Sequence, residues 1–266
     1  MKISIVTLSF NQSGYLGEAI ESVVGQGYPD LEYILVDPGS TDGSRELIRS
    51  FGGLISQTVF ESDKGAADGL NKGFAKATGE VFGFLNADDL LEPGSLHRVA
   101  EFFDRHPQCD IAFGNGYVID GNGKRVKHYK ARDFTARRYF YGGSQWLQQS
   151  TFFRPEIFRR VGGFNVENRT CWDGELFVTM VNEGARAGYI DADLGEFRIY
   201  PASLTGSGRM KEQYVADSRR VFRQVRGRSW KVADEIWRCL YRAEGVAIRI
   251  GATLQRFAGK PEIVAD

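Results

Sequence analysis

Two adjacent aspartates end an apolar run in the first third of the chain. Residues 82–87 are mostly apolar and β-forming, and Asp88 and Asp89 follow them directly. Neighbouring carboxylates repel each other unless a positive group lies beside them. A hard divalent cation such as Mg²⁺ or Mn²⁺, carrying a phosphate-bearing ligand, would supply that group. The alternative is that the pair caps a helix whose first turn contains Pro93, and these residues alone leave both interpretations open.

Two further aspartates follow predicted strands of the same region. Apolar, β-forming segments alternate there with amphipathic helical patterns, which predicts a parallel sheet with helices on both faces. Strands are expected at residues 3–8, 31–36, 57–61 and 80–85. Ligands of such sheets bind at the carboxyl ends of the strands. Asp37 and Asp63 are therefore expected to line one crevice with Asp88 and Asp89.

The pattern changes after about residue 105, where strands and helices no longer alternate regularly. Strands are expected at 110–120, 124–129, 148–154, 189–190 and 197–200, and helices at 155–161 and 175–183. From about residue 210 to about residue 257 the pattern is helical. This part of the chain is expected to complete the sheet and then to leave it.

Composition and cysteine usage narrow the function classes. Lysine and arginine together number 34, as do aspartate and glutamate, so no overall charge favours nucleic acid as a partner. The cysteines, Cys109, Cys171 and Cys239, show neither metal-ligand spacing nor a disulfide framework, which indicates a reducing compartment. The sequence contains neither a signal-peptide pattern nor an apolar run of about 18 residues, so we expect a cytoplasmic protein without a membrane span.

The last part of the chain is basic and helical. Residues 209–266 contain 13 basic and 7 acidic side chains, a local net charge of +6. Large apolar residues recur there at helical spacing, among them Trp230, Trp237 and Tyr241. One hypothesis is an amphipathic surface that contacts a membrane or a lipid-linked acceptor. The other is a set of helices that packs on the body of the protein or on a second copy in a homodimer.

Several segments, in order, resemble a known family. Ser4–Asn11, Val36–Gly43 and Asn86–Asp89 are similar to motifs of family 2 inverting glycosyltransferases with the GT-A fold, and the resemblance covers about residues 1–205. It implies an α/β fold with a central, mostly parallel sheet flanked by helices, to which the chain adds a C-terminal helical extension. The expected units are a catalytic domain at 1–208, with a nucleotide-binding half at 1–105 and an acceptor-binding half at 106–208, and the extension at 209–266.

The same resemblance implies a reaction. A nucleotide-sugar, expected to be a UDP-sugar, would bind with Mn²⁺ or Mg²⁺, and a single displacement would transfer the sugar with inversion. The acceptor would be a hydroxyl of a glycan or of a lipid-linked acceptor, in bacterial cell-surface polysaccharide biosynthesis. The protein would then act in the cytoplasm or peripherally at the inner face of the cell membrane.

The resemblance also assigns donor-binding residues. Thr7 and Asp37 match positions that hold the nucleotide base, and Asp63 matches a further position near the base or the ribose. Each residue also has a structural interpretation, such as a turn for Asp37 or a helix face for Asn71. The predicted donor-binding set is Thr7, Asp37, Asp63, Lys64, Asn71, Lys72 and Asp88.

Asp88 and Asp89 match the metal-binding motif of the family, in which Asn86 here replaces the leading aspartate. Both carboxylates are assigned to the metal site. Asp89 is expected to bind the ion directly, and Asp88 is expected to contact the ribose or a metal-bound water. A cation held by them would stabilise the charge that develops on a departing diphosphate.

Asp173 matches the position of the catalytic base. An acceptor hydroxyl attacks well only as its proton leaves, and a general base that takes this proton contributes roughly 10²–10⁴-fold. The chain departs from the family pattern nearby, because Gln148 and Tyr200 occupy positions where histidine is usual and Trp172 replaces a glutamate. These departures keep one alternative open: a catalytically inactive GT-A-like module that only binds nucleotide-sugars.

Two other enzyme classes lack their characteristic loop in this sequence. A nucleotidyltransferase would need a glycine-rich, basic loop after the first strand, and a dinucleotide-dependent oxidoreductase would need a G-x-G-x-x-G segment there. The residues at this place are Ser9–Gln12, which form neither motif.

Overall fold

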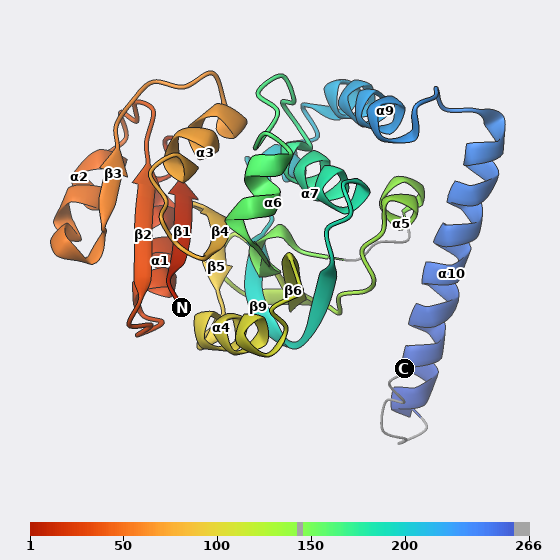
Figure 1. The fold of residues 1–266 in the computed structure, drawn as a ribbon, viewed down its shortest axis with the longest axis horizontal. Helices are drawn as coiled ribbons and strands as arrows, with labels where there is room; N and C mark the ends of the chain where they lie inside the picture. Colours follow the sequence, from red (N-terminus) through yellow and green to blue (C-terminus); the bar gives the residue numbers. More distant parts are fainter. Residues whose placement is uncertain (143–145, 258–266) are drawn as a thin grey trace.

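The first third of the chain forms the alternating strands and helices that its apolar pattern predicts (Figure 1). The structure, a computed structural model, describes residues 1–142 and 146–257. β1 pairs in parallel with two other strands, β2 and β4, and β3 adds to the other side of β2. The elements of this part are β1 (Ile3–Leu8), α1 (Ser13–Val24), β2 (Leu31–Val36), α2 (Ser44–Ser50), η1 (Gly52–Leu54), β3 (Gln57–Val59), α3 (Ala66–Phe74), β4 (Val81–Asn86), β5 (Leu90–Leu91) and α4 (Ser95–Arg105).

The second part of the sheet is mixed rather than mostly parallel. Its elements are β6 (Ile111–Ile119), β7 (Arg125–Tyr129), α5 (Ala136–Tyr141), η2 (Gln148–Ser150), β8 (Thr151–Phe153), α6 (Pro155–Arg160), α7 (Trp172–Asn182), β9 (Ala187–Arg198) and α8 (Leu204–Ser207). Over the described residues, the sheet contains four parallel and four antiparallel strand pairs. The parallel pairs among β1, β2, β3 and β4 match the expectation, and the sheet becomes mixed because β8 lies antiparallel between β4 and β6.

Two elements near the predicted base differ from their expected bounds. α7 begins at Trp172 rather than at residue 175, so Asp173 lies in its first turn and not before the helix. The two late strands form the single strand β9, which follows β6 in parallel. The pairing of β6 with β9 shifts register between Gly114 and Gly116, and such irregularities let one long strand bend with its sheet.

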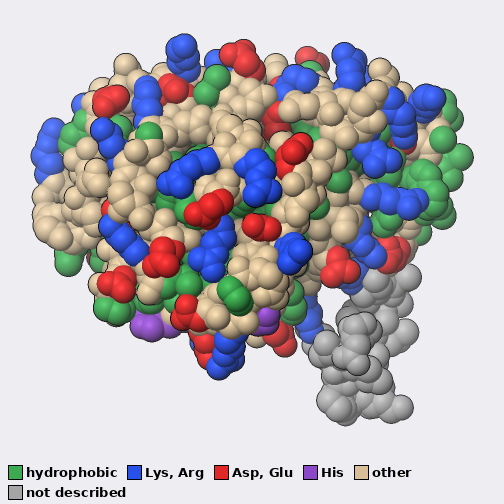
Figure 2. Space-filling view, viewed as in Figure 1, with side chains coloured by type: hydrophobic (Ala, Val, Ile, Leu, Met, Phe, Trp, Pro, Cys, Tyr) green, Lys and Arg blue, Asp and Glu red, His purple; other side chains and the backbone are tan. Residues whose placement is uncertain are grey.

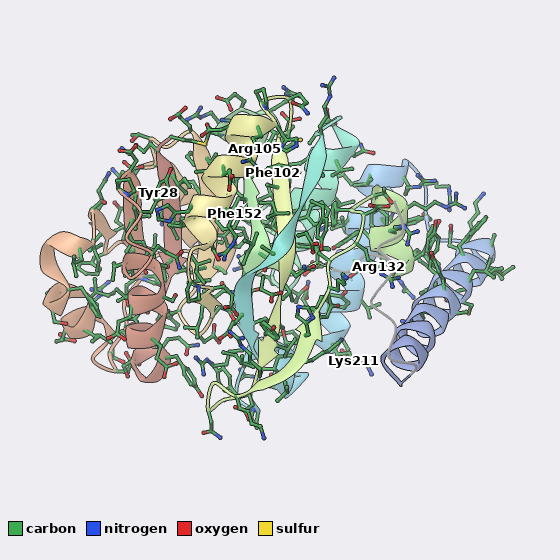
Figure 3. The ribbon with its side chains drawn as sticks, turned by 90° about the horizontal axis from the view of Figure 1, so that it is seen from below. Tyr28, Phe102, Arg105, Arg132, Phe152 and Lys211 are labelled. Atoms are coloured by element: carbon green, nitrogen blue, oxygen red, sulfur yellow. The ribbon has the colours of Figure 1, made fainter. Side chains whose placement is uncertain are left out.

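Apolar side chains form a cluster on each face of the sheet. The cluster beneath α1 and α4 includes Phe152 of β8, which Figure 3 shows on the same side as Phe102 of α4. The cluster on the opposite face is aromatic and joins α3, α6 and α7 to the strands. It includes Phe74, Phe82, Phe84, Phe153, Phe158, Phe164, Trp172 and Phe177. This aromatic cluster anchors the helix that carries Asp173.

Two glycines allow α3 to pack closely on the ends of the strands. A Cβ on Gly73 would lie 2.5 Å from Val6 Cγ1, and a Cβ on Gly69 would lie 2.6 Å from Asp63 Oδ2. Both distances are far below a normal van der Waals contact. Any larger residue would push the helix away, so these glycines fix the wall beside Asp63.

The helical pattern after residue 210 forms two helices, α9 (Lys211–Arg226) and α10 (Val232–Phe257). The aromatic residues of this region pack on α5 of the body. The Tyr141 ring lies 5.6 Å from the Trp230 ring and 5.9 Å from the Tyr241 ring, and its hydroxyl donates to Asp234 Oδ1 at 2.7 Å. Arg137 stacks over the Trp237 ring at 4.0 Å. These contacts confirm the hypothesis that the C-terminal helices pack on the body of the protein through their aromatic residues.

A second face of α10 points away from the body. Val232, Ile236 and Leu240 are 83%, 61% and 53% exposed, at the spacing of successive helical turns. Figure 2 shows hydrophobic side chains along the outer edge of the molecule where α10 lies. We call these three residues the outer stripe. In the part of the chain that the structure describes, no helix combines the length and apolarity that crossing a bilayer requires.

Candidate active site

The carboxyl ends of the parallel strands bring aspartates to one edge of the sheet. Asp37 follows β2, Asp63 follows β3 after a short loop, and Asp88 follows β4. Asp37 and Asp63 lie near enough for the charge of Asp37 to raise the pKa of Asp63, after the larger effect of burial. Such an edge is where α/β sheets bind their ligands.

Asp37 is fully buried, and its contacts leave one oxygen unused. Its Oδ1 accepts hydrogen bonds from the backbone N–H groups of Gly39 at 2.9 Å and Ser40 at 2.8 Å, and from Arg45 Nε at 2.9 Å. Burial opposes ionisation, but Ser40, Arg45 and Gly39 outweigh it and hold the pKa of Asp37 below its usual value. No described residue donates to the buried Oδ2. A buried carboxylate oxygen without a donor is costly, which indicates a ligand N–H or O–H here.

Thr7 faces the interior instead. Its side chain is 0% exposed, and the Tyr33 hydroxyl donates to Thr7 Oγ1 at 3.0 Å. Unlike Asp37 Oδ2, Thr7 Oγ1 already has a protein partner, so a contact between Thr7 and a nucleotide base stays a prediction.

The loop after β3 carries Asp63 and Lys64. Asp63 is half-buried and accepts a hydrogen bond from the Gly65 backbone N–H at 2.9 Å. Burial raises the pKa of Asp63 against that bond. The backbone carbonyl of Lys64 accepts a hydrogen bond from Arg169 Nη1, so the loop also contacts the segment that leads into α7.

Asn71 and Lys72 of α3 have protein partners. Asn71 Nδ2 donates to the Phe164 carbonyl at 2.8 Å, and the Phe164 N–H donates to Asn71 Oδ1 at 2.9 Å. Lys72 Nζ donates to the Ser62 carbonyl and lies 3.1 Å from Asp68 Oδ2. Both side chains thus support the loops around the pocket, and a direct contact with a donor stays a prediction.

The sequence predicts Asp89 as the direct metal ligand, but the structure engages both of its oxygens with protein donors. Asp89 is 1% exposed; Oδ1 accepts from the Arg198 N–H at 2.9 Å, and Oδ2 accepts from Gln149 Nε2 at 2.6 Å and Asn86 Nδ2 at 3.0 Å. Burial and the neighbouring Asp88 charge raise the pKa of Asp89 well above its usual value. In this arrangement Asp89 connects β4 to distant segments of the chain.

Asp88 is the more accessible carboxylate of the pair. It is half-buried, and its Oδ2 accepts a hydrogen bond from the Tyr200 hydroxyl at 3.1 Å. That hydroxyl also lies 3.2 Å from the Gln12 amide, and burial raises the pKa of Tyr200 to about 12. Arg198 Nε donates to the Asp88 carbonyl at 2.7 Å. Tyr200, at a position where the family resemblance implies histidine, therefore orients Asp88.

A divalent cation fits these residues if the ligand supplies part of its coordination. Over residues 1–142 and 146–257, the structure contains no group of three or more His, Cys, Asp or Glu side chains that could hold a metal ion. Within the same residues, Asp88 Oδ1 receives no side-chain hydrogen bond. Mg²⁺ and Mn²⁺ sites commonly combine one or two carboxylates with substrate phosphates and water. Asp88 with a bound diphosphate would form such a site.

Asp173 lies apart from this group, in the first turn of α7. It is half-buried, and burial raises the pKa of its carboxyl, although the Gly174 N–H opposes the shift. The N-terminal end of a helix favours a negative charge. The Tyr139 hydroxyl packs so closely on Gly174 that no Cβ fits there. Asp173 therefore combines a raised proton affinity with a fixed place on a helix.

The glutamines before β8 serve the site indirectly. Gln148, which the family resemblance places on the acceptor side, is 6% exposed and donates through Nε2 to the Phe84 carbonyl at 2.6 Å. Gln149 holds Asp89 as described. Neither this role of Gln149 nor the contacts of Arg45 and Arg169 are among the sequence-based expectations. Only Arg45 had a sequence signal, because it lies in the helix directly after the Asp37 turn.

The chain matches the family model described as Glycosyl transferase family 2 over residues 4–160. It is 33% identical over 218 residues to the putative teichuronic acid biosynthesis glycosyltransferase TuaG of Bacillus subtilis, an alignment that covers 77% of this chain and 82% of TuaG. The chain spans 66% of the length of the first curated relatives that it matches, slightly under two thirds.

Solved structures share the fold. Residues 1–349 of S. aureus TarS in complex with UDP superimpose with a TM-score of 0.68 at 19% identity, covering 88% of this chain and 68% of that one. The mannosyltransferase PcManGT from Pyrobaculum calidifontis, in complex with GDP-Man and Mn²⁺, gives a TM-score of 0.65 at 17% identity, covering 96% and 80%. At these identities the likeness establishes the GT-A architecture of the sheet and its helices, as predicted.

Proposed function

Because the chain belongs to glycosyl transferase family 2, we propose that it is a metal-dependent inverting glycosyltransferase that uses a nucleotide-sugar donor. The observation that carries the proposal is the separation of its carboxylates. Asp37 and Asp88 follow the parallel strands β2 and β4, whereas Asp173 lies in the first turn of α7, where burial and backbone N–H groups rather than a neighbouring charge set its pKa. An inverting displacement needs this division, with leaving-group chemistry on one side of the sugar and one base on the other.

On the donor side, Asp37 is proposed to recognise the nucleotide base. Its buried Oδ2 has no donor among the described residues, and a base N–H would satisfy it. The N3–H of uracil is such a donor, and TarS is a structural neighbour solved with UDP. A UDP-sugar is therefore the first donor to test, with a GDP-sugar as the comparison that PcManGT suggests.

Asp88, rather than Asp89, is proposed to hold the divalent cation. Its carboxylate is half-buried with one oxygen bound only to Tyr200, whereas the oxygens of Asp89 accept three protein hydrogen bonds. When bound, Mn²⁺ or Mg²⁺ supplies Lewis-acid stabilisation of the charge on the departing diphosphate. Tyr200 would keep Asp88 in the orientation that this requires.

On the acceptor side, Asp173 is proposed as the general base. It would accept the proton of an acceptor hydroxyl as the oxygen of that hydroxyl bonds to the anomeric carbon. The bond between the anomeric carbon and the diphosphate oxygen breaks in the same step, and its electron pair leaves with the nucleoside diphosphate. Because burial raises the pKa of Asp173, the acid limb of the rate profile is expected above the usual range of an aspartate.

The acceptor is proposed to be a glycan or lipid-linked glycan of a cell-surface polysaccharide, at the cytoplasmic face of the membrane. Support comes from TuaG, whose name places it in teichuronic acid biosynthesis. The outer stripe of α10 favours a membrane contact, because Val232, Ile236 and Leu240 are exposed on a C-terminal segment with a net charge of +6. Anionic lipids would complement that charge.

Pelleting with vesicles of anionic phospholipid tests the membrane contact. The protein is expected to pellet, and Ile236→Glu is expected to reduce the bound fraction several-fold; Leu54→Glu, at another exposed apolar side chain, is the matched control. Equal pelleting of Ile236→Glu and wild type would remove the proposal. Sedimentation velocity of the same variants detects the competing outcome, a homodimer through the outer stripe.

The reaction is tested by thermal shift and turnover together. With Mn²⁺ present, UDP or a UDP-sugar is expected to raise the melting temperature, and Asp37→Asn is expected to abolish most of that shift. Release of nucleoside diphosphate in the presence of acceptor would then demonstrate transfer. Binding without release of nucleoside diphosphate, with every donor that binds, would favour the inactive binding module instead.

A further inference from the structure

Helix α9, in the C-terminal part of the chain, forms hydrogen bonds with the first turn of α7. Glu175, two residues beyond the proposed base, is 4% exposed, and its carboxylate accepts hydrogen bonds from Arg220 Nη1 at 2.8 Å and Nη2 at 2.7 Å. Asn165 and Asn168 add donors at 2.9 and 2.6 Å. These donors outweigh burial and hold the pKa of Glu175 below its usual value. Glu175 is thus an ionised, fully satisfied anchor, and a bidentate arginine fixes its orientation.

A second residue of α9 holds the segment that leads into α7. Asp217, one turn before Arg220, is 4% exposed and accepts hydrogen bonds from Thr170 Oγ1 at 2.8 Å and the Arg169 N–H at 3.2 Å. Asn168 Oδ1 accepts from the Cys171 N–H at 3.0 Å, which closes the turn before the helix. The same face of α9 therefore fixes both the turn before α7 and its first helical turn.

The segment before α7 also contacts the loop that carries Asp63. Arg169 Nη1 donates to the carbonyl of Lys64, in the loop that carries Asp63. Movement of this segment would therefore change the distance between the base on α7 and the donor loop. Among the described residues, the ion-pair partner of Glu175 is Arg220, whose guanidinium neutralises a carboxylate that is buried two residues beyond Asp173.

We propose that Arg220 is a positioning residue for the transfer step, and that α9 is part of the active site rather than an appendage. The inference rests on the proposed function, because it concerns the placement of Asp173. Because Arg220 contacts Glu175 rather than Asp173, it acts through Glu175 on the first turn of α7. A misplacement of about 1 Å in a reacting group can lower a rate by about 10²-fold.

The test compares Arg220→Ala and Arg220→Lys in the full-length protein. Arg220→Ala is expected to lower kcat by about 10–100-fold per nucleotide-binding site, with the KM for the nucleotide-sugar within about threefold of wild type. Arg220→Lys keeps a positive charge beside the Glu175 carboxylate and is expected to recover most of the lost kcat. Arg219→Ala and Arg223→Ala remove exposed arginines from the same helix and are expected to keep wild-type kcat.

Counting active sites by UDP titration separates positioning from loss of folded protein, since a variant that only unfolds would lose binding sites and keep kcat per site. If Arg220→Ala does not fold, Glu175→Gln decides, because it removes the charge that pairs with Arg220, and wild-type kcat per site in this variant overturns the inference. Wild-type kcat in Arg220→Ala also overturns it, provided that Asp173→Asn is inactive. An active Asp173→Asn would instead refute the proposed function.

Discussion

The donor side and the base side of the site are held in place by different kinds of contact. Asp37 is fixed by Gly39, Ser40 and Arg45, all within eight positions of it. The turn of Asp173 is fixed through Glu175 by Arg220, which lies 45 positions further along the chain. The proposed donor contact of Asp37 therefore depends on local sequence, whereas the position of the proposed base depends on the packing of a remote helix. Substitutions are expected to separate the two.

The largest expected effect distinguishes the two adjacent aspartates. Asp88→Asn is expected to lower transfer by at least about 10²-fold and to abolish the metal dependence of nucleotide binding, because a neutral amide is a poor ligand for a hard cation. Its melting temperature is expected to stay near that of wild type. Titration calorimetry with UDP, with and without Mn²⁺, measures this.

Asp89→Asn is the matched variant, and its expected loss is in stability. The asparagine NH2 group cannot accept the hydrogen bonds that Arg198, Gln149 and Asn86 donate to Asp89. Each buried donor left without an acceptor lowers the unfolding free energy by about 1–3 kcal/mol. If Asp89→Asn removed the metal dependence at an unchanged melting temperature, the sequence-based assignment of Asp89 as the ligand would stand.

A smaller effect is expected from a network that stabilises the donor half by itself. Glu32 is 5% exposed and accepts hydrogen bonds from Lys2, Ser4 and Thr78. These bonds outweigh burial and lower the pKa of Glu32 from 4.5 to about 2. A lowered pKa stabilises the fold above pH 4.5, and this stabilisation is lost as the pH falls towards 2. Relative to Glu32→Gln, the unfolding free energy of the wild type is expected to fall by about 3 kcal/mol as the pH is lowered through this range.

Chemical denaturation of both proteins between these pH values checks the Glu32 prediction. Parallel pH dependence of the unfolding free energy in the two proteins would mean that Glu32 is not the group responsible. At neutral pH, the turnover per nucleotide-binding site of Glu32→Gln is expected to match wild type, because the network does not reach α7.

The smallest expected effect tests the assignment of Asn71 to the donor pocket. Asn71→Ala removes two hydrogen bonds to the Phe164 backbone and is expected to cost about 2 kcal/mol of unfolding free energy. The affinity for UDP is expected to change by less than about threefold, because both polar atoms of the side chain are occupied in the free protein. A tenfold loss of affinity without a loss of stability would favour a direct contact with the donor.

The sequence predicts β1, β2 and β4 well because these strands are buried on both faces and read as continuous apolar runs. β1 and β2 have the expected bounds, and β4 differs by one residue at each end. The errors occur where a distant partner decides the structure. The single strand β9 depends on its pairing with β6, and the antiparallel β8 depends on its place between β4 and β6.

The candidate site follows the same rule. The motif spacing locates Asp37, Asp63, Asp88 and Asp173, because local turns and helix starts set their positions. It assigns Asp89 as the direct metal ligand without showing that both oxygens of Asp89 have protein partners, since two of these partners come from residues 149 and 198. Likewise, no sequence pattern connects Arg220 to Glu175. Those contacts join residues that are far apart in the sequence and form only in the folded chain.

The central claim is that donor binding and proton removal reside in separable parts of the molecule. Asp173→Asn tests it most directly, with UDP affinity in the presence of Mn²⁺ and the rate of sugar transfer measured on the same preparation. The account predicts an affinity within about twofold of wild type and a transfer rate lower by roughly 10²–10⁴-fold. An Asp173→Asn protein that transfers sugar near the wild-type rate would contradict it.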